Sequence, residues 1–65
     1  MHLHIPDMHC GGCVRSVTAV ITALDANARV ETELDGRTAT AQTIASAEQV
    51  LAALEEAGFP AYKLG

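Results

Sequence analysis

The spacing of apolar residues changes from a strand-like period of two to a helical period, and back, twice within 65 residues. Alternating polar and apolar residues predict strands at 2–5, 29–34 and 38–43, and a short final strand is expected at 61–64. Apolar residues spaced three and four apart predict amphipathic helices at 13–25 and 47–57. The expected order is therefore strand, helix, strand, strand, helix, strand.

This order predicts one specific arrangement of layers. A helix that links two strands normally makes them parallel through a right-handed crossover. Asp35-Gly36 is a strong signal for a two-residue hairpin between the second and third strands. Two crossover units that share a central hairpin predict an α+β fold, the ferredoxin-like βαββαβ sandwich, with a four-stranded antiparallel sheet and both helices on one face. No linker or low-complexity tract interrupts the chain, so residues 1–65 are expected to form a single domain.

The predicted core is aliphatic, because the chain has one Phe and one Tyr. A domain of this length buries only about 60% of its unfolded surface, so its apolar stripes must be used efficiently. Ser46 and Gln49 fit a capping box at the start of the second helix, and Gly58 is expected to end it. The inward-facing residues are expected to be Leu3, Ile5, Val14, Val17, Val20, Ile21, Leu24, Val30, Thr32, Leu34, Ala39, Ala41, Ala47, Val50, Leu51, Leu54 and Ala57.

The formal charge of −4 excludes the commonest nucleic-acid binders, which neutralise phosphates with a basic surface. It also disfavours binding to anionic lipid. No apolar run approaches the roughly 20 residues needed to span a bilayer, and the N-terminus lacks a signal-peptide pattern. We therefore expect a cytoplasmic protein with no nucleic-acid partner and no membrane insertion.

The chemistry of the chain is concentrated in Met8-His9-Cys10-Gly11-Gly12-Cys13, which contains both of its cysteines. Thiolates are soft ligands for Cu(I), Hg(II) and Zn(II), and they also exchange disulfides. Two sulfurs suffice for Cu(I), whereas a structural zinc site needs four ligands. Cys10 and Cys13 are thus the predicted metal ligands. We expect Cys13 on the first helical turn, where the helix dipole favours a thiolate. The two glycines are expected to bend the loop.

Neighbouring residues have alternative roles. His9 could be a further ligand, but a solvent-facing side chain is the favoured interpretation. Met8 could bind metal through its thioether, although a core residue that anchors the loop is favoured. Phe59 is expected to lie near the loop as an apolar cover. His2 and His4 are interpreted as solvent-facing, with a copper(II) site formed by His2 and the α-amine as the alternative.

The motif Met-x-Cys-x-x-Cys, matched by Met8, Cys10 and Cys13, resembles the signature of the heavy-metal-associated domain family. This family includes small copper chaperones and the N-terminal metal-binding domains of copper-transporting P-type ATPases. The resemblance covers the whole chain, including the βαββαβ order and the turn at Gly58 and Phe59.

The resemblance implies that Cys10 and Cys13 bind Cu(I) while Met8 packs inward. It also implies metal ion transport by ligand exchange, from this chain to a metal-binding domain of a copper-transporting P-type ATPase or to another copper acceptor. A copper-bridged homodimer is possible within this scheme. Where this chain has Phe59, eukaryotic members commonly have Lys and many bacterial members Tyr. Zinc-type members often have Asp directly before the first cysteine, where this chain has His9, so copper is the favoured metal.

Three alternatives remain open. The chain could be a regulatory metal-binding domain of a heavy-metal transporter, although the position of Met1 at the start of the first strand favours a free-standing chaperone. It could carry another soft ion, such as Hg, or Zn or Cd. A thiol–disulfide oxidoreductase is less favoured, because such enzymes usually place an aromatic residue and a proline around the Cys-x-x-Cys pair. We therefore expect a binding protein and not an enzyme.

Overall fold

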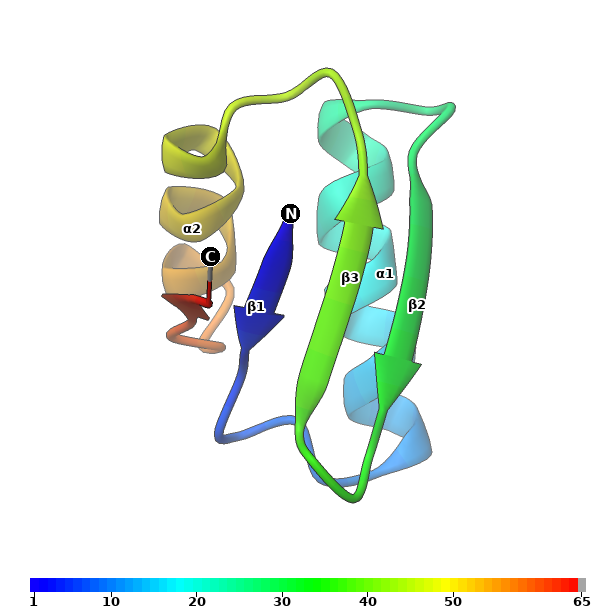
Figure 1. Ribbon diagram of the computed structural model, residues 1–65, viewed down its shortest axis with the longest axis vertical. Coiled ribbons are helices and arrows are strands. Elements are labelled where there is room, and N and C mark those ends of the chain that lie inside the picture. The colour runs from blue at the N-terminus through cyan, green and yellow to red at the C-terminus, as the bar shows by residue number, and fades with distance from the viewer. Residues whose placement is uncertain (65) are drawn as a thin grey trace.

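The computed structural model, which describes residues 1–64, contains six elements in the predicted order (Figure 1). All neighbouring strands are antiparallel, in the order β2-β3-β1-β4. The elements are β1 (His2–His4), α1 (Gly11–Leu24), β2 (Arg29–Glu33), β3 (Thr38–Gln42), α2 (Ala47–Glu56) and β4 (Tyr62–Lys63).

Each helical crossover skips one strand of the sheet. β1 and β2 are separated by β3, and β3 and β4 are separated by β1, so each crossover leaves room for a strand from the other unit. Both helices lie behind the sheet in the view of Figure 1 and pack against each other. The ferredoxin-like sandwich predicted from the sequence is confirmed.

The core lies between the sheet and the two helices. Ala39 and Ala41 present small side chains from β3, which lets the buried side chains of α1 and α2 approach the sheet closely. The fully buried apolar residues are Leu3, Ile5, Met8, Val17, Ile21, Ala39, Ala41, Val50 and Leu54.

Three residues that the apolar stripes placed in the core are exposed. Leu24 and Leu34 are each 42% exposed, and Ala57 is also exposed. These predictions were wrong because each residue lies at or just beyond the end of its helix or strand, where the opposite layer no longer covers it.

The second helix has the predicted ends. Ser46 accepts a hydrogen bond from the amide of Gln49 at 3.1 Å, and the Gln49 side chain accepts one from the amide of Ser46 at 3.0 Å. This reciprocal pair is the expected capping box. Gly58 follows the helix with a φ of 91°, a left-handed conformation that glycine adopts without steric cost.

The β2–β3 connection differs from the two-residue hairpin that Asp35-Gly36 predicted. Glu33 pairs with Thr38, so the connection comprises residues 34–37, and the left-handed residue is Arg37 with a φ of 53°. The Arg37 amide donates to the carbonyl of Leu34 at 3.2 Å and closes the turn. The turn signal located the connection correctly but gave it the wrong length.

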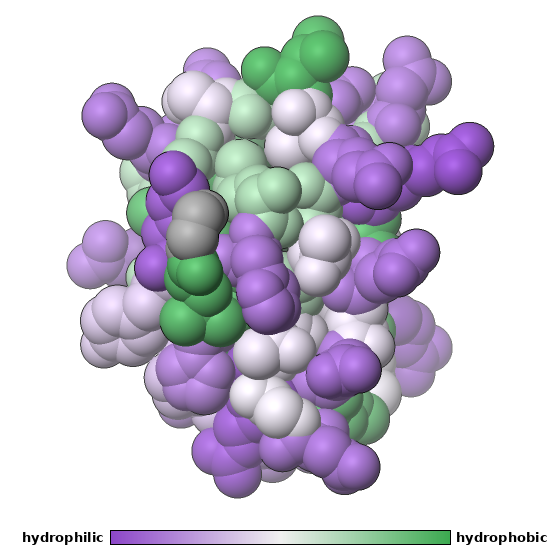
Figure 2. All heavy atoms as spheres, viewed as in Figure 1, coloured by the Kyte–Doolittle hydropathy of each residue, from purple (hydrophilic) through white to green (hydrophobic). Residues whose placement is uncertain are grey.

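Figure 2 shows the face of the sheet that the helices leave uncovered, where hydrophilic side chains predominate and smaller apolar patches lie between them. No helix within residues 1–64 has the length and apolar character required to cross a bilayer.

Candidate metal-binding site

The loop between β1 and α1 is held at its base by the β2–β3 connection. The Ile5 amide donates to the carbonyl of Arg37 at 2.8 Å, and Nη1 of Arg37 donates to the carbonyl of Pro6 at 2.9 Å. Both segments lie at the same end of the molecule in Figure 1. The Met8 amide then donates to the carbonyl of Ile5 at 2.9 Å, which turns the chain toward the cysteines. The hairpin therefore fixes where the metal-binding loop starts.

Met8 anchors this loop from inside the protein. Its side chain has no exposed surface and belongs to the same core cluster as Leu3, Ile5 and Leu54. A thioether buried in this way contacts apolar neighbours and is not presented to a metal at the surface. The location supports the predicted core role of Met8.

Cys10 is the N-cap of α1, and this local structure brings the two sulfurs together. The amide of Cys13 donates to Sγ of Cys10 at 3.4 Å, and the amide of Val14 donates to the Cys10 carbonyl at 3.1 Å. The helix begins at Gly11, two residues before its predicted start, so Gly11 and Gly12 form its first turn and do not bend a loop. Cys13 lies on this first turn, as expected.

The two thiols are free and close together. Their Sγ atoms are 3.1 Å apart, and the side chain of Cys10 is exposed whereas that of Cys13 is half-buried. The pKa of the Cys10 thiol is lowered, chiefly because the Cys13 thiol and then the Cys13 amide donate hydrogen bonds to its sulfur. The Gly12 amide and the charge of Arg15 act in the same direction. The lowered pKa favours the thiolate form of Cys10, which is the form that binds metals.

The sequence analysis assigned the thiolate-stabilising helix terminus to Cys13. The structure adds Cys10, whose sulfur receives the amide hydrogen bond that a Ser or Asp side chain usually accepts at an N-cap. Sequence reasoning missed this role because cysteine is not a common N-cap residue. The available signal was the spacing of Cys10 and Cys13, which matches the distance from an N-cap to the third helical residue.

The geometry allows both sulfurs to bind one ion after a small adjustment. Tetrahedral coordination with metal–sulfur distances of about 2.3 Å requires the sulfurs to be about 3.8 Å apart, and a more linear site requires a wider separation. Added Cβ atoms would meet nothing within 4 Å at Gly11 and only Sγ of Cys10, at 3.9 Å, at Gly12. The surface next to the sulfurs is thus free of bulky side chains, so a ligand from another protein can reach the metal.

His9 lies beside the cysteines. A ring nitrogen of His9 and the sulfurs of Cys10 and Cys13 all lie within 4.8 Å of one another. The His9 side chain is exposed, as expected, and its Nδ1 is 2.8 Å from the carbonyl oxygen of Asp7.

The remaining predicted residues have different surroundings. Phe59 is half-buried and packs against the core cluster, and its role as a cover of the cysteines stays a prediction. His2 is exposed and His4 is half-buried on β1. The α-amine of Met1 donates to the carbonyl of Ala41 at 3.1 Å, so a copper(II) site formed by the amine and His2 would have to break this bond.

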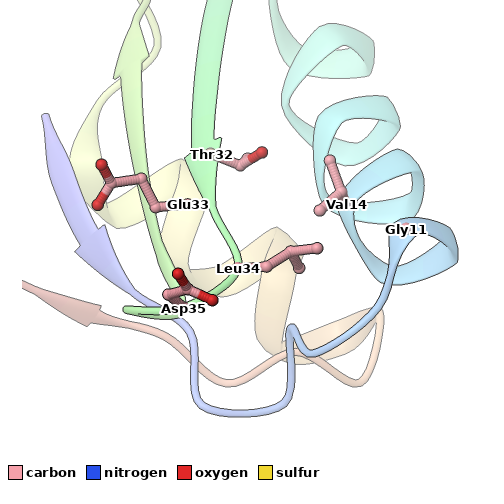
Figure 3. Close-up of a pocket in the computed structure, with 6 residues that line it drawn as sticks. All are labelled: Gly11, Val14, Thr32, Glu33, Leu34 and Asp35. Carbon is pink, nitrogen blue, oxygen red and sulfur yellow. The ribbon is translucent and has the colours of Figure 1, made fainter.

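A shallow groove next to the site was not predicted. Figure 3 shows the side chains of Val14, Thr32 and Leu34 pointing into the space between the start of α1 and the end of β2. The available sequence signal for the groove was Leu34, an apolar residue at the end of the expected strand. Its place in an apolar stripe predicted burial instead. Glu33 points to the other side of β2 in this view, and with Asp35 it adds polar groups to the lining of the groove.

Comparison with known proteins agrees with this geometry. The family described as "Heavy-metal-associated domain" matches residues 2–60. An uncharacterised protein of Haemophilus influenzae is 34% identical over 61 residues, which cover 91% of this chain and 90% of that protein.

Two solved structures superpose closely. A crystal structure of a gold binding protein has a TM-score of 0.90 and 51% identity, with 94% of each chain covered. The copper chaperone Atx1 from Synechocystis PCC6803 has a TM-score of 0.92 and 27% identity, with 95% of this chain and 98% of that chain covered. With its paired thiols at a helix start and a family match from the first strand to Pro60, the chain belongs to the heavy-metal-associated domain family and is a heavy-metal-binding protein.

Proposed function

We propose that this protein is a copper chaperone that carries Cu(I) on Cys10 and Cys13 and passes it to an acceptor protein by ligand exchange. The observation that carries this proposal is the pair of free thiols 3.1 Å apart at the start of α1, one of them with a lowered pKa. A pair of thiolates is a sufficient ligand set for a soft monovalent ion and an insufficient one for a structural zinc ion.

The unequal exposure of the two sulfurs suits stepwise transfer. A thiolate of the acceptor can bind the metal from the open side, above Gly11 and Gly12, and form a shared three-sulfur complex. The exposed Cys10 then leaves the metal and takes up a proton, while the half-buried Cys13 holds the ion until a second acceptor thiolate replaces it. The ion is never released to water in this sequence of steps.

The acceptor that fits this chemistry is a protein with its own exposed pair of thiols, such as the metal-binding domain of a copper-transporting P-type ATPase. A second copy of this chain also satisfies the description, so a copper-bridged homodimer is a further expected species. Free thiols need a reducing compartment, and we propose that the protein acts in the cytoplasm.

A second candidate cargo is Au(I). The 51% identity with a gold binding protein favours it, and a soft monovalent ion makes the same demands on two thiolates. Thiol–disulfide exchange is disfavoured by comparison, because the two cysteines lie in a ferredoxin-like fold whose family is defined by metal binding.

The test is a competition titration in which the protein and a chromogenic chelator compete for Cu(I), Au(I) and Hg(II), with the variants Cys10→Ser and Cys13→Ser. Each variant should lose at least about tenfold in Cu(I) affinity while the circular dichroism stays unchanged, because the core does not contain the metal. Ala19→Ser is the matched control, since it adds a hydroxyl to an exposed position of α1 away from the loop. A Cys10→Ser variant that binds Cu(I) as tightly as the parent would overturn the proposal. Turnover in an insulin-reduction assay would favour the oxidoreductase instead.

A further inference from the structure

His9 offers a third ligand that the two-sulfur proposal leaves unused. A ring nitrogen of this residue lies within 4.8 Å of the sulfurs of both Cys10 and Cys13. Its side chain is exposed, so movement toward the sulfurs displaces water and not packed neighbours. Among residues 1–64, these three residues form a group whose ligand atoms already converge.

The hydrogen bond of His9 fixes which of its nitrogens is available. Nδ1 is 2.8 Å from the carbonyl oxygen of Asp7, and a carbonyl oxygen can only accept a hydrogen bond. Nδ1 therefore carries the proton, and in the neutral ring the lone pair is on Nε2. A histidine that binds a metal through one nitrogen commonly donates the other N–H to a backbone carbonyl, which fixes its tautomer and orientation.

We propose that Nε2 of His9 is the third ligand of a site with two sulfurs and one nitrogen, and that this site lets the chain bind a divalent ion such as Zn(II) in addition to a soft monovalent ion. The inference rests on the proposed function, because Cys10 and Cys13 must bind metal for His9 to complete the set. An imidazole nitrogen suits Zn(II), which two sulfurs alone hold with half of the ligands it prefers.

The exposed side chains can make the required movement. With metal–sulfur distances of about 2.3 Å and a metal–nitrogen distance of about 2.0–2.1 Å, a tetrahedral site places nitrogen and sulfur about 3.6 Å apart. One ring nitrogen of His9 starts within 4.8 Å of both sulfurs, and movement of the exposed ring brings Nε2 to the metal while the sulfurs separate from 3.1 Å to about 3.8 Å. Rotation of two exposed side chains, His9 and Cys10, can provide both changes.

Three protein ligands leave the fourth position of a tetrahedral ion open to water or to an incoming ligand. Zinc sites of this open type exchange their fourth ligand, whereas structural sites are closed by four protein ligands. The divalent ion would thus be held at the surface and remain transferable.

The test compares Zn(II) and Cu(I) affinities of the parent with those of His9→Ala and His9→Gln, using chelator competition. Loss of His9 should weaken Zn(II) binding at least about tenfold, which is the lower end of what even outer-sphere changes cost a metal site. His2→Ala is the matched control, because it removes an exposed imidazole from β1 and should leave Zn(II) affinity unchanged. Imidazole nitrogen resonances of the Zn(II)-loaded parent should show that Nε2 of His9 binds the metal and that Nδ1 keeps its proton.

The outcomes separate this inference from the proposed function. Cys10→Ser should weaken both metals, whereas His9→Ala should weaken Zn(II) strongly and Cu(I) by less than about threefold. A parent that binds Cu(I) tightly but does not bind Zn(II), or binds it equally well without His9, would overturn the His9 inference alone. A parent whose Cu(I) affinity does not depend on the cysteines would overturn the proposed function itself.

Discussion

The role of Met8 can be tested by separating its contribution to stability from any contribution to metal binding. Its side chain has no exposed surface and lies in the core cluster directly beneath the loop that carries the cysteines. If Met8 acts only through packing, then substitutions should change the free energy of unfolding according to the volume removed. Metal affinity should follow only as far as the loop remains folded.

The expected magnitudes differ clearly between two variants. Met8→Leu conserves most of the volume and should cost less than about 1.5 kcal/mol, whereas Met8→Ala leaves a cavity and should cost about 2–5 kcal/mol. At about 0.05–0.15 kcal/mol per residue, the whole domain has only about 3–10 kcal/mol of stability. Met8→Ala should therefore lower the melting temperature by about 8 °C or more, and could leave a measurable unfolded fraction.

The assay is urea unfolding of the metal-free protein, combined with Cu(I) competition on the same preparations. We expect Met8→Leu to change Cu(I) affinity by less than about threefold, because the ligands Cys10 and Cys13 and the hydrogen bond between them are retained. A Met8→Leu variant of nearly unchanged stability that lost about a hundredfold or more in Cu(I) affinity would refute the packing interpretation. It would make the thioether a ligand.

Two further predictions concern stability. Gly58→Ala should destabilise the protein by about 1–2 kcal/mol in urea unfolding, because an L-residue is strained at a φ of 91°. Gly11→Ala, at a helical position with equally open space, should be neutral or stabilising by up to about 1 kcal/mol. Equal effects of the two substitutions would contradict the conformational argument. The pKa of Asp25 is lowered by hydrogen bonds from the Thr43 hydroxyl and then from the amides of Ile44 and Asn27. The stabilising effect of the Asp25 carboxylate should therefore be complete above the unfolded pKa of about 4, and it should disappear as the pH falls through the folded pKa. Asp25→Asn should therefore be less stable than the parent at pH 6, with the difference shrinking toward pH 3, and a difference independent of pH would show that the charge has no part in it.

Most of the fold could be predicted because short-range patterns specify it. The alternation that places Ala39 and Ala41 inward, and the helical spacing of Val17 and Ile21, depend only on neighbours in the sequence. Once the order of elements was known, the crossover rules left the ferredoxin-like sheet as the predicted topology, and the structure confirms it.

The errors have two causes, a local helix cap that residue type did not signal and contacts distant in the sequence. Glycines have poor helix propensity, so Gly11 and Gly12 were placed in a loop, although the cap provided by Cys10 makes them helical. The left-handed conformation of Arg37 has no signal in its residue type. Its carbonyl and its guanidinium both bind the segment at Ile5 and Pro6, and these contacts hold the longer turn in place.

The two candidate ligands could be identified from the sequence, but their electrostatic relation could not. That Cys10 accepts hydrogen bonds from Cys13 depends on the direction of the helix start, and that His9 donates through Nδ1 depends on where the carbonyl of Asp7 points. The sequence identifies the side chains that can bind a metal. The backbone amide and carbonyl groups that form hydrogen bonds with those side chains can be located only in the folded structure.

The most direct test of the central claim is X-ray absorption spectroscopy at the copper edge of the Cu(I)-loaded protein, with the same measurement on Cys13→Ser. We predict a first shell with two sulfur atoms in the parent, and the loss of one sulfur per copper in the variant. A parent spectrum dominated by nitrogen and oxygen, or one that Cys13→Ser leaves unchanged, would contradict the claim that the two thiols at the start of α1 hold the ion.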